Sequence, residues 1–210
     1  MVKKLRLAAA AAVLVAATSL GGPAMAQGLG PDAGLSAYDR NVFFFGGRFH
    51  STSFYDSAFV WGLPYDDAYF LGAGYQEYFF RSDWNVTIGS EVGLGLRYDM
   101  HGPASVEAWG GLVFRHDGVV MFDTFRVSPA LTVGFSAASG TVASETDRAN
   151  AIGFTGHLLV YLGPEIAITP VDNPDVEGFF RVQHRSGGFG LIVDGLNGSN
   201  AVNLGVRFKF

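Results

Sequence analysis

The amino-acid sequence predicts an all-β fold, a single eight-stranded antiparallel transmembrane up-and-down β-barrel. Three observations support this prediction: an export signal at the start, segments of about ten residues with alternating apolar and polar positions, and a final strand that ends on phenylalanine. The 210-residue chain contains 29 glycines, 19 phenylalanines and 8 tyrosines but only 16% charged residues. This composition is typical of membrane barrels, in which aromatic residues form belts and glycines relieve crowding on curved strands.

Residues 1–26 have the organisation of a secretory signal peptide. Three basic residues within positions 3–6 precede an apolar run over residues 7–20, and Ala-Met-Ala at 24–26 has the small-x-small pattern of a cleavage site. The alternative is an N-terminal membrane anchor, but the run is short for a span of roughly 20 residues. We therefore predict a cleaved signal peptide over 1–26, a flexible leader over 27–40 and a barrel over 41–210.

Composition and motifs argue against several function classes. The chain contains no cysteine, so it has neither disulfides nor thiolate metal ligands. Removing the three basic residues of the signal lowers the net charge from −5 to −8, and an acidic chain without a Lys/Arg cluster is not expected to bind nucleic acid. The histidines at 50, 101, 116 and 157 lack metal-ligand spacing and are interpreted as rim or lumen residues. No metal or organic cofactor is expected.

About eight segments alternate with period two and are separated by turn-rich stretches. The predicted strands cover residues 42–51, 68–80, 86–98, 105–115, 126–136, 151–162 (with 168 as an alternative end), 176–186 and 201–210. Pro129 weakens the fifth. With both ends of the barrel in the periplasm, the outer loops are 52–67, 99–104, 137–150 and 187–200, and the inner turns are 81–85, 116–125 and about 169–175. The charged residues 145, 147 and 148 are interpreted as a solvated loop tip.

The third and fourth segments show which face of each strand meets lipid. In residues 86–98 one face carries valine, isoleucine and leucine, and the other carries glycine with charged residues. In a membrane barrel the apolar face contacts lipid and the polar face fills the lumen. We therefore expect Glu91, Arg97, Glu107 and Arg115 to form an ionic network inside the barrel. Because side chains largely fill an eight-stranded barrel, an open channel is not expected.

The seventh segment places a histidine and a serine on its outer face. Arg181, Gln183 and Arg185 alternate with apolar residues and are expected in the lumen, so His184 and Ser186 continue the lipid-facing side near the outer leaflet. Because these two residues are two positions apart on one face of a strand, their Cα atoms lie about 6.5–7 Å apart, which permits contact between the side chains. A hydroxyl beside an imidazole is the minimal activated nucleophile, and a third group usually orients the base.

The last segment carries an assembly signature. Apolar or aromatic residues occupy every second position from Val202 to Phe210, with polar residues and glycine between them. This pattern resembles the C-terminal signature by which the assembly machinery recognises outer-membrane barrels. Together with the export signal, it predicts the outer membrane of a Gram-negative bacterium as the location.

The C-terminal region also resembles a known enzyme family. The stretch 184–190 (His-Arg-Ser-Gly-Gly-Phe-Gly), followed by Gly-Ser-Asn-Ala at 198–201 and Gly-Val-Arg-Phe-Lys-Phe at 205–210, is similar to the lipid A 3-O-deacylase family. Its broader relatives are described as acyloxyacyl-hydrolase-like outer-membrane proteins. The resemblance implies an eight-stranded barrel that removes an ester-linked acyl chain from the lipid A of lipopolysaccharide, reached laterally from the outer leaflet.

Carried over residue by residue, the resemblance implies that Ser186 is the nucleophile and His184 the base. The family also uses an acidic residue. Asp194 is the only carboxylate side chain after Ser186, and Asn200 is a second candidate to orient the imidazole. The family pattern has asparagine directly after the serine as an oxyanion donor. Here that position is glycine, so the backbone N–H groups of Gly187 and Gly188 are the candidate donors.

These departures from the family pattern leave two alternatives open. One is a variant acyl-ester hydrolase, which requires His184 and Ser186 to be in contact on the outer wall with an orienting group behind the imidazole. The other is a structural or ligand-binding barrel that acts through its loops. The structural barrel predicts that the two side chains do not touch and that no group orients His184. The ligand-binding barrel predicts that function lies in the loops 52–67 and 137–150.

Overall fold

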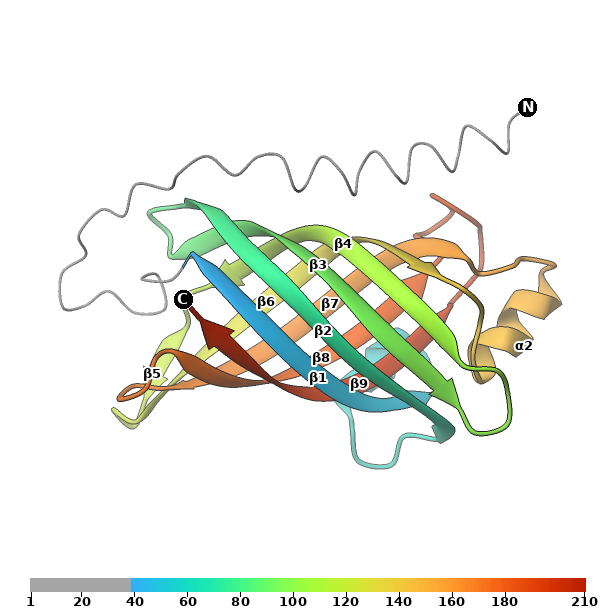
Figure 1. Ribbon diagram of the computed structural model, residues 1–210, viewed down its shortest axis with the longest axis horizontal. Coiled ribbons are helices and arrows are strands. Elements are labelled where there is room, and N and C mark those ends of the chain that lie inside the picture. Colours follow the sequence, from blue (N-terminus) through green and yellow to red (C-terminus); the bar gives the residue numbers. More distant parts are fainter. Residues whose placement is uncertain (1–38) are drawn as a thin grey trace. The chain divides into compact units, whose positions relative to one another are not determined.

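The computed structural model describes residues 39–210, so the predicted signal peptide and nearly all of the predicted leader lie outside the described residues. Within this range eight long antiparallel strands and one short strand form a closed barrel (Figure 1). The strands are β1 (Arg40–His50), β2 (Tyr65–Arg81), β3 (Val86–Asp99), β4 (Ser105–His116), β5 (Val119–Met121), β6 (Phe125–Ala138), β7 (Leu158–Pro170), β8 (Val176–Ser186) and β9 (Ser199–Lys209). A 3₁₀ helix, η2 (Phe54–Ala58), and an α-helix, α2 (Ser144–Ala151), lie in the connections.

Each long strand pairs with its neighbours in the chain, and β1 pairs with β9 to join the first and last strands. The short β5 pairs only with the start of β6, while β4 pairs with β6 directly and completes the ring. The connections 51–64, 100–104, 139–157 and 187–198 lie at the end that carries α2, here called the outer end. The turns 82–85, 117–124 and 171–175 lie at the inner end, so the predicted grouping of loops and turns is confirmed.

The predicted strands match the observed ones except for the sixth. We expected it over 151–162, but β7 covers Leu158–Pro170, so the alternative end near residue 168 is the better prediction. Residues 144–151 are helical instead. Gly153 and Gly156 have φ values of +65° and +67°, a left-handed conformation that interrupts an extended strand. Pro129 does not break β6, because the ladder to β7 continues through the pair Pro129–Ile166.

The outer face of the barrel is apolar. Alternate residues on each strand point outward, and Leu94, Val106 and Leu204 are 70%, 61% and 72% exposed. Other large apolar side chains on this face are Phe44, Leu71, Leu96, Leu112, Leu131, Val133, Ile166 and Phe208. This is the surface predicted for a barrel whose outer wall contacts lipid.

Inside the barrel, buried carboxylates pair with buried arginines. The predicted ionic network is confirmed: Glu91 accepts two hydrogen bonds from Arg181, at 2.7 and 2.9 Å, and Arg97 lies 3.2 Å from Glu107. Arg115 instead forms a bidentate pair with Glu177 of β8, at 2.8 Å for both bonds. A cluster of aromatic side chains fills the space between the charged groups, and its members are Phe43, Phe45, Phe49, Phe70, Trp109, Tyr161 and Phe179.

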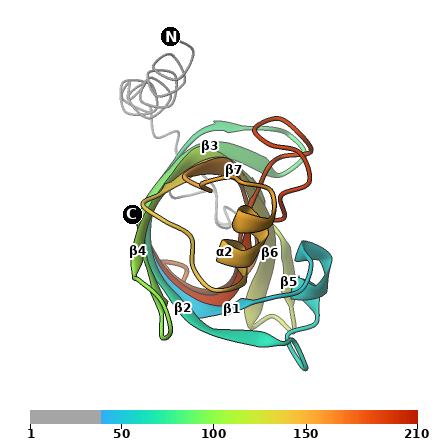
Figure 2. The ribbon, with the colours of Figure 1, turned by 90° about the vertical axis from the view of Figure 1, so that its right-hand side faces the viewer.

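The helix α2 lies in the outer mouth of the barrel. Figure 2 looks onto this end and shows α2 inside the ring of strands. Glu145 at its start is 1% exposed and accepts hydrogen bonds from Arg97 and from Arg185, the latter at 2.8 Å. The prediction of a solvated loop tip is therefore wrong for Glu145, whose carboxylate is neutralised by two lumen arginines. No helix in the described range is long and apolar enough to cross a membrane.

The lumen network should dominate the stability of the barrel. Glu177 is fully buried and accepts hydrogen bonds from Arg115, Arg207 and Lys209. We expect Glu177→Gln to lower the free energy of unfolding by about 3–5 kcal/mol, because it leaves buried cations without their counter-charge. Urea titration of the refolded barrel, followed by tryptophan fluorescence, measures this change.

A matched control for this variant is Glu77→Gln. Glu77 pairs with Arg40 at 3.2 Å, but the two side chains are 32% and 48% exposed. The same substitution there should change the free energy of unfolding by less than about 1 kcal/mol. Equal effects of the two variants would contradict the dominant role of the lumen network.

Candidate functional site

His184 and Ser186 lie on the outer wall of the barrel, as predicted. Their neighbours on β8 point inward: Gln183 donates to Glu107 at 3.0 Å, and Arg185 donates to Glu145 in the lumen. Because side chains alternate along a strand, His184 and Ser186 must point outward. His184 is nevertheless only 5% exposed, since the Phe54 ring of η2 covers it at a centroid distance of 4.5 Å.

Asn200 orients the His184 imidazole. The two residues are directly paired across β8 and β9, and the Nδ1 atom of His184 lies 2.6 Å from Oδ1 of Asn200. The Nδ2 group of Asn200 donates to the Thr52 carbonyl at 3.0 Å. A carbonyl can only accept, so this bond sets the direction of the amide and turns its oxygen toward His184. Nδ1 therefore carries the imidazole proton, and Nε2 is left as the acceptor.

Ser186 forms no hydrogen bond to this imidazole in the structure. Within residues 39–210 the Ser186 hydroxyl forms no hydrogen bond to His184, and Nε2 of His184 has no hydrogen-bond partner. The hydrogen bond required for catalysis is thus missing, whereas the required orienting group is present. A rotation of the two side chains on one face of the strand is needed to bring the hydroxyl to Nε2.

Asp194 is not part of the arrangement around His184. It is an exposed residue of the connection 187–198, and no hydrogen bond joins it to His184 in the described chain. The structure thus does not bring Asp194 to the imidazole, and its role as the third member stays a prediction. The reason is topological: Asp194 lies beyond the paired ends of β8 and β9, while Asn200 lies opposite His184 in the ladder.

Gly187 is not available as an oxyanion donor, because its N–H donates to the Leu196 carbonyl at 2.8 Å. The loop conformation also explains why this position is glycine. A Cβ atom at 187 would lie 1.9 Å from the Val193 carbonyl oxygen, so asparagine cannot occupy the position in this conformation. The N–H of Gly188 donates no hydrogen bond within the described residues and remains a candidate donor.

A second serine–histidine pair lies beside the first. His50 faces outward on β1, paired with Asn200 of β9, and its Nε2 atom lies 2.9 Å from the Ser57 hydroxyl. Its Nδ1 atom lies 3.0 Å from the Thr52 hydroxyl. We interpreted His50 as a rim or lumen residue, although its alternation with the inward-facing Phe49 could have indicated the outer wall. His50 and Ser57 are each 1% exposed, so the pair fixes the connection 51–64 rather than meeting a substrate.

Arg148 connects α2 to the surroundings of the site. Its guanidinium donates to the carbonyls of Gly198 at 2.8 Å, Asn197 at 3.2 Å and Ser51. These carbonyls precede Asn200 and Thr52 by one to three residues. Burial lowers the pKa of Arg148 from its ordinary value, and the Asp66 carboxylate acts in the opposite direction. One side chain thus holds the ends of two connections that together position Asn200.

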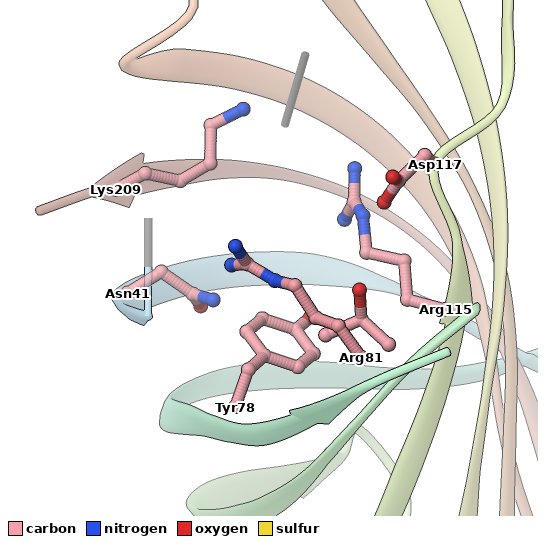
Figure 3. A pocket seen from close by; sticks show the side chains of 7 residues that line it. Asn41, Tyr78, Arg81, Arg115, Asp117 and Lys209 are labelled. Atoms are coloured by element: carbon pink, nitrogen blue, oxygen red, sulfur yellow. The ribbon is translucent and has the colours of Figure 1, made fainter. Parts of the chain in front are cut away.

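A small pocket lies at the inner end, far along the barrel from His184. Figure 3 shows Asn41, Tyr78, Arg81, Arg115 and Lys209 pointing toward its centre. Arg115 and Lys209 already pair with Glu177, and Arg81 pairs with Asp39 at 3.2 Å. The pocket is therefore a region of balanced charge within the lumen network. Nowhere in residues 39–210 do three His, Cys, Asp or Glu side chains converge as metal ligands.

Comparisons with known proteins show the fold. No family model matches the chain, and neither does any curated protein. A crystal structure of the outer membrane enzyme PagL is similar over 81% of this chain and 99% of that one, with 13% identity and a TM-score of 0.54. Neisserial surface protein A is similar over 81% of this chain and 97% of its own, with 11% identity and a TM-score of 0.49. The N-terminal β-barrel domain of Pseudomonas aeruginosa OprF is similar over 82% of this chain and 98% of its own, with 11% identity and a TM-score of 0.45. The chain is a closed eight-stranded antiparallel β-barrel whose fold resembles that of outer-membrane proteins.

Proposed function

We propose that this protein is an acyl-ester hydrolase of the cell outer membrane, which acts on the lipid A part of lipopolysaccharide. Ser186 is the nucleophile and His184 the general base. The observation that carries the proposal is the 2.6 Å contact between His184 and Asn200 on the outer wall. It supplies an imidazole of defined tautomer, with its accepting nitrogen free, on the face of the barrel that would meet lipid.

The chemistry follows from the proposed roles. Nε2 of His184 takes the hydroxyl proton while Oγ of Ser186 attacks the ester carbonyl carbon and forms a C–O bond. The tetrahedral oxyanion would accept a hydrogen bond from the Gly188 N–H. The ester C–O bond then breaks, and the imidazolium gives the proton to the leaving alkoxide oxygen, which departs as a sugar hydroxyl. His184 then takes a proton from a water molecule that attacks the acyl carbon, the bond from this carbon to Oγ breaks, and the imidazolium returns the proton to Oγ as the fatty acid leaves.

Asn200 orients the His184 imidazole but carries no charge of its own. A carboxylate in the same place would also stabilise the imidazolium that forms during the reaction, whereas a neutral amide does so only through its dipole. A slow hydrolase is therefore expected.

The location is part of the proposal. The apolar outer wall and the alternation of Leu204, Val206 and Phe208 on β9 support insertion by the outer-membrane assembly machinery. Export through the predicted signal peptide would deliver the chain to that machinery. The lipopolysaccharide substrate would then reach His184 and Ser186 laterally, from within the outer leaflet.

The second candidate is a non-catalytic barrel that is structural or binds ligands through its outer loops. Two observations favour it. The Ser186 hydroxyl is not bonded to His184, and the Phe54 ring covers the imidazole.

Lipid A mass spectrometry tests the proposal directly. In a host with hexa-acylated lipid A, expression of the protein should remove one acyl-chain mass. Ser186→Ala should abolish this loss, because no nucleophile remains. Ser128→Ala is the matched control, since Ser128 is a buried serine that donates to the Asp117 carbonyl at 2.9 Å near the inner end, and it should retain activity.

Two outcomes would count against the proposal. If Ser57→Ala loses activity while Ser186→Ala keeps it, the nucleophile and base would be Ser57 and His50 instead. An unchanged lipid A profile with a correctly folded, heat-modifiable barrel would favour the non-catalytic candidate.

The role of Asn200 gives a further prediction. Asn200→Leu should lower kcat about 10²–10⁴-fold with little change in KM, because the imidazole loses the partner that fixes its proton on Nδ1. Asn41→Leu removes an equally buried asparagine at the inner end and should leave kcat unchanged. Steady-state kinetics on purified lipid A compare the two variants. Equal kcat values would remove the proposed orienting role.

A further inference from the structure

The connection 51–64, here called the outer strap, does not cover the mouth of the barrel. It lies outside the wall, as Figure 2 shows for η2, whereas α2 lies inside the ring. The strap is fixed against the outward faces of β1, β9 and β8 by Ser57 on His50, the Thr52 carbonyl on Asn200 and Phe54 on His184. A connection at the end of a barrel therefore lies against a face that would otherwise meet lipid.

Several polar groups of the strap form hydrogen bonds within the protein. Its single charged residue, Asp56, accepts hydrogen bonds from the backbone N–H and the hydroxyl of Ser53, at 3.1 and 2.9 Å. The Ser51 N–H donates to the Pro64 carbonyl at 3.1 Å, and the Tyr65 hydroxyl donates to the Val60 carbonyl at 2.9 Å. These contacts reduce the cost of moving the strap out of water.

The large apolar side chains that the strap exposes are aromatic. Tyr55, Phe59 and Trp61 are 75%, 72% and 92% exposed, and no lysine or arginine accompanies them in the strap. Below them the apolar wall continues through Phe44 and Leu204, which are 51% and 72% exposed. A soluble surface rarely exposes so many large apolar groups together, whereas aromatic side chains are enriched where a membrane protein crosses the interface.

We propose that the outer strap is a lipid-binding surface, in which Tyr55, Phe59 and Trp61 bind the acyl chains of membrane lipids just below their headgroups. The depth follows from the backbone, because irregular backbone is not tolerated in the centre of the bilayer but is tolerated at its interface. The inference rests on the membrane location in the proposed function, but it requires no catalysis. It also places a lipid acyl chain beside His184, which Phe54 of the same strap contacts.

Trp61 is a natural probe of this surface. The chain has three tryptophans: Trp61, the 83% exposed Trp84 of the inner turn 82–85, and Trp109, which is 1% exposed in the lumen. Trp84→Phe therefore leaves Trp61 as the only exposed tryptophan. The double variant Trp61→Phe, Trp84→Phe gives the background emission of Trp109.

The experiment reconstitutes the Trp84→Phe protein into phosphatidylcholine vesicles that contain lipid brominated either near the headgroup or near the methyl end of the chain. We expect the headgroup-proximal bromines to remove most of the Trp61 emission, the distal bromines to remove less, and aqueous acrylamide to remove little. Strong quenching by acrylamide with no effect of either brominated lipid would overturn the proposal, since the strap would then face water.

Insertion is measured separately, by heat-modifiable migration and protease resistance of the barrel. A chain that does not insert overturns both the membrane location and the lipid contact. A chain that inserts but keeps Trp61 accessible to acrylamide overturns the lipid contact alone.

Discussion

Buried carboxylates and guanidinium groups neutralise each other along the whole interior of this barrel. Some of these pairs join strands that are distant in the sequence, as when Arg181 of β8 donates to Glu91 of β3 as well as to Glu165 of the adjacent β7. A one-residue slip of any strand would turn these charges toward the apolar outer face. The network therefore fixes the register of every strand that contributes to it.

The candidate site depends on that register. His184 lies between Gln183 and Arg185, and both of these side chains are held by lumen carboxylates. Their inward direction is what turns the imidazole outward. In the same way Ser199, which accepts from Arg97 in the lumen, leaves Asn200 facing out toward His184. The outward direction of His184 and Asn200 is thus fixed by charged side chains on the lumen side of the same strands.

The strands and the lumen charges could be predicted from the sequence because both depend on a local period of two. The surroundings of His184 could not. The bond from Asn200 to Thr52 joins residues that are 148 positions apart, and nothing in the alternation near either residue indicates it. Asp194 was a candidate because it is a carboxylate, whereas the residue paired with His184 across β8 and β9 is Asn200. The strap and α2 lie in connections without periodicity, so the sequence did not show that one lies outside the barrel and the other inside.

Arg148 changes what is expected of the outer connections over evolutionary time. Loops at the end of a barrel usually vary freely in length and sequence, because few contacts join them to one another. Here a single guanidinium on α2 holds the carbonyls of Ser51, Asn197 and Gly198. An insertion in any one of the three connections would displace the other two. The lengths and sequences of the three connections are therefore expected to change together among related proteins.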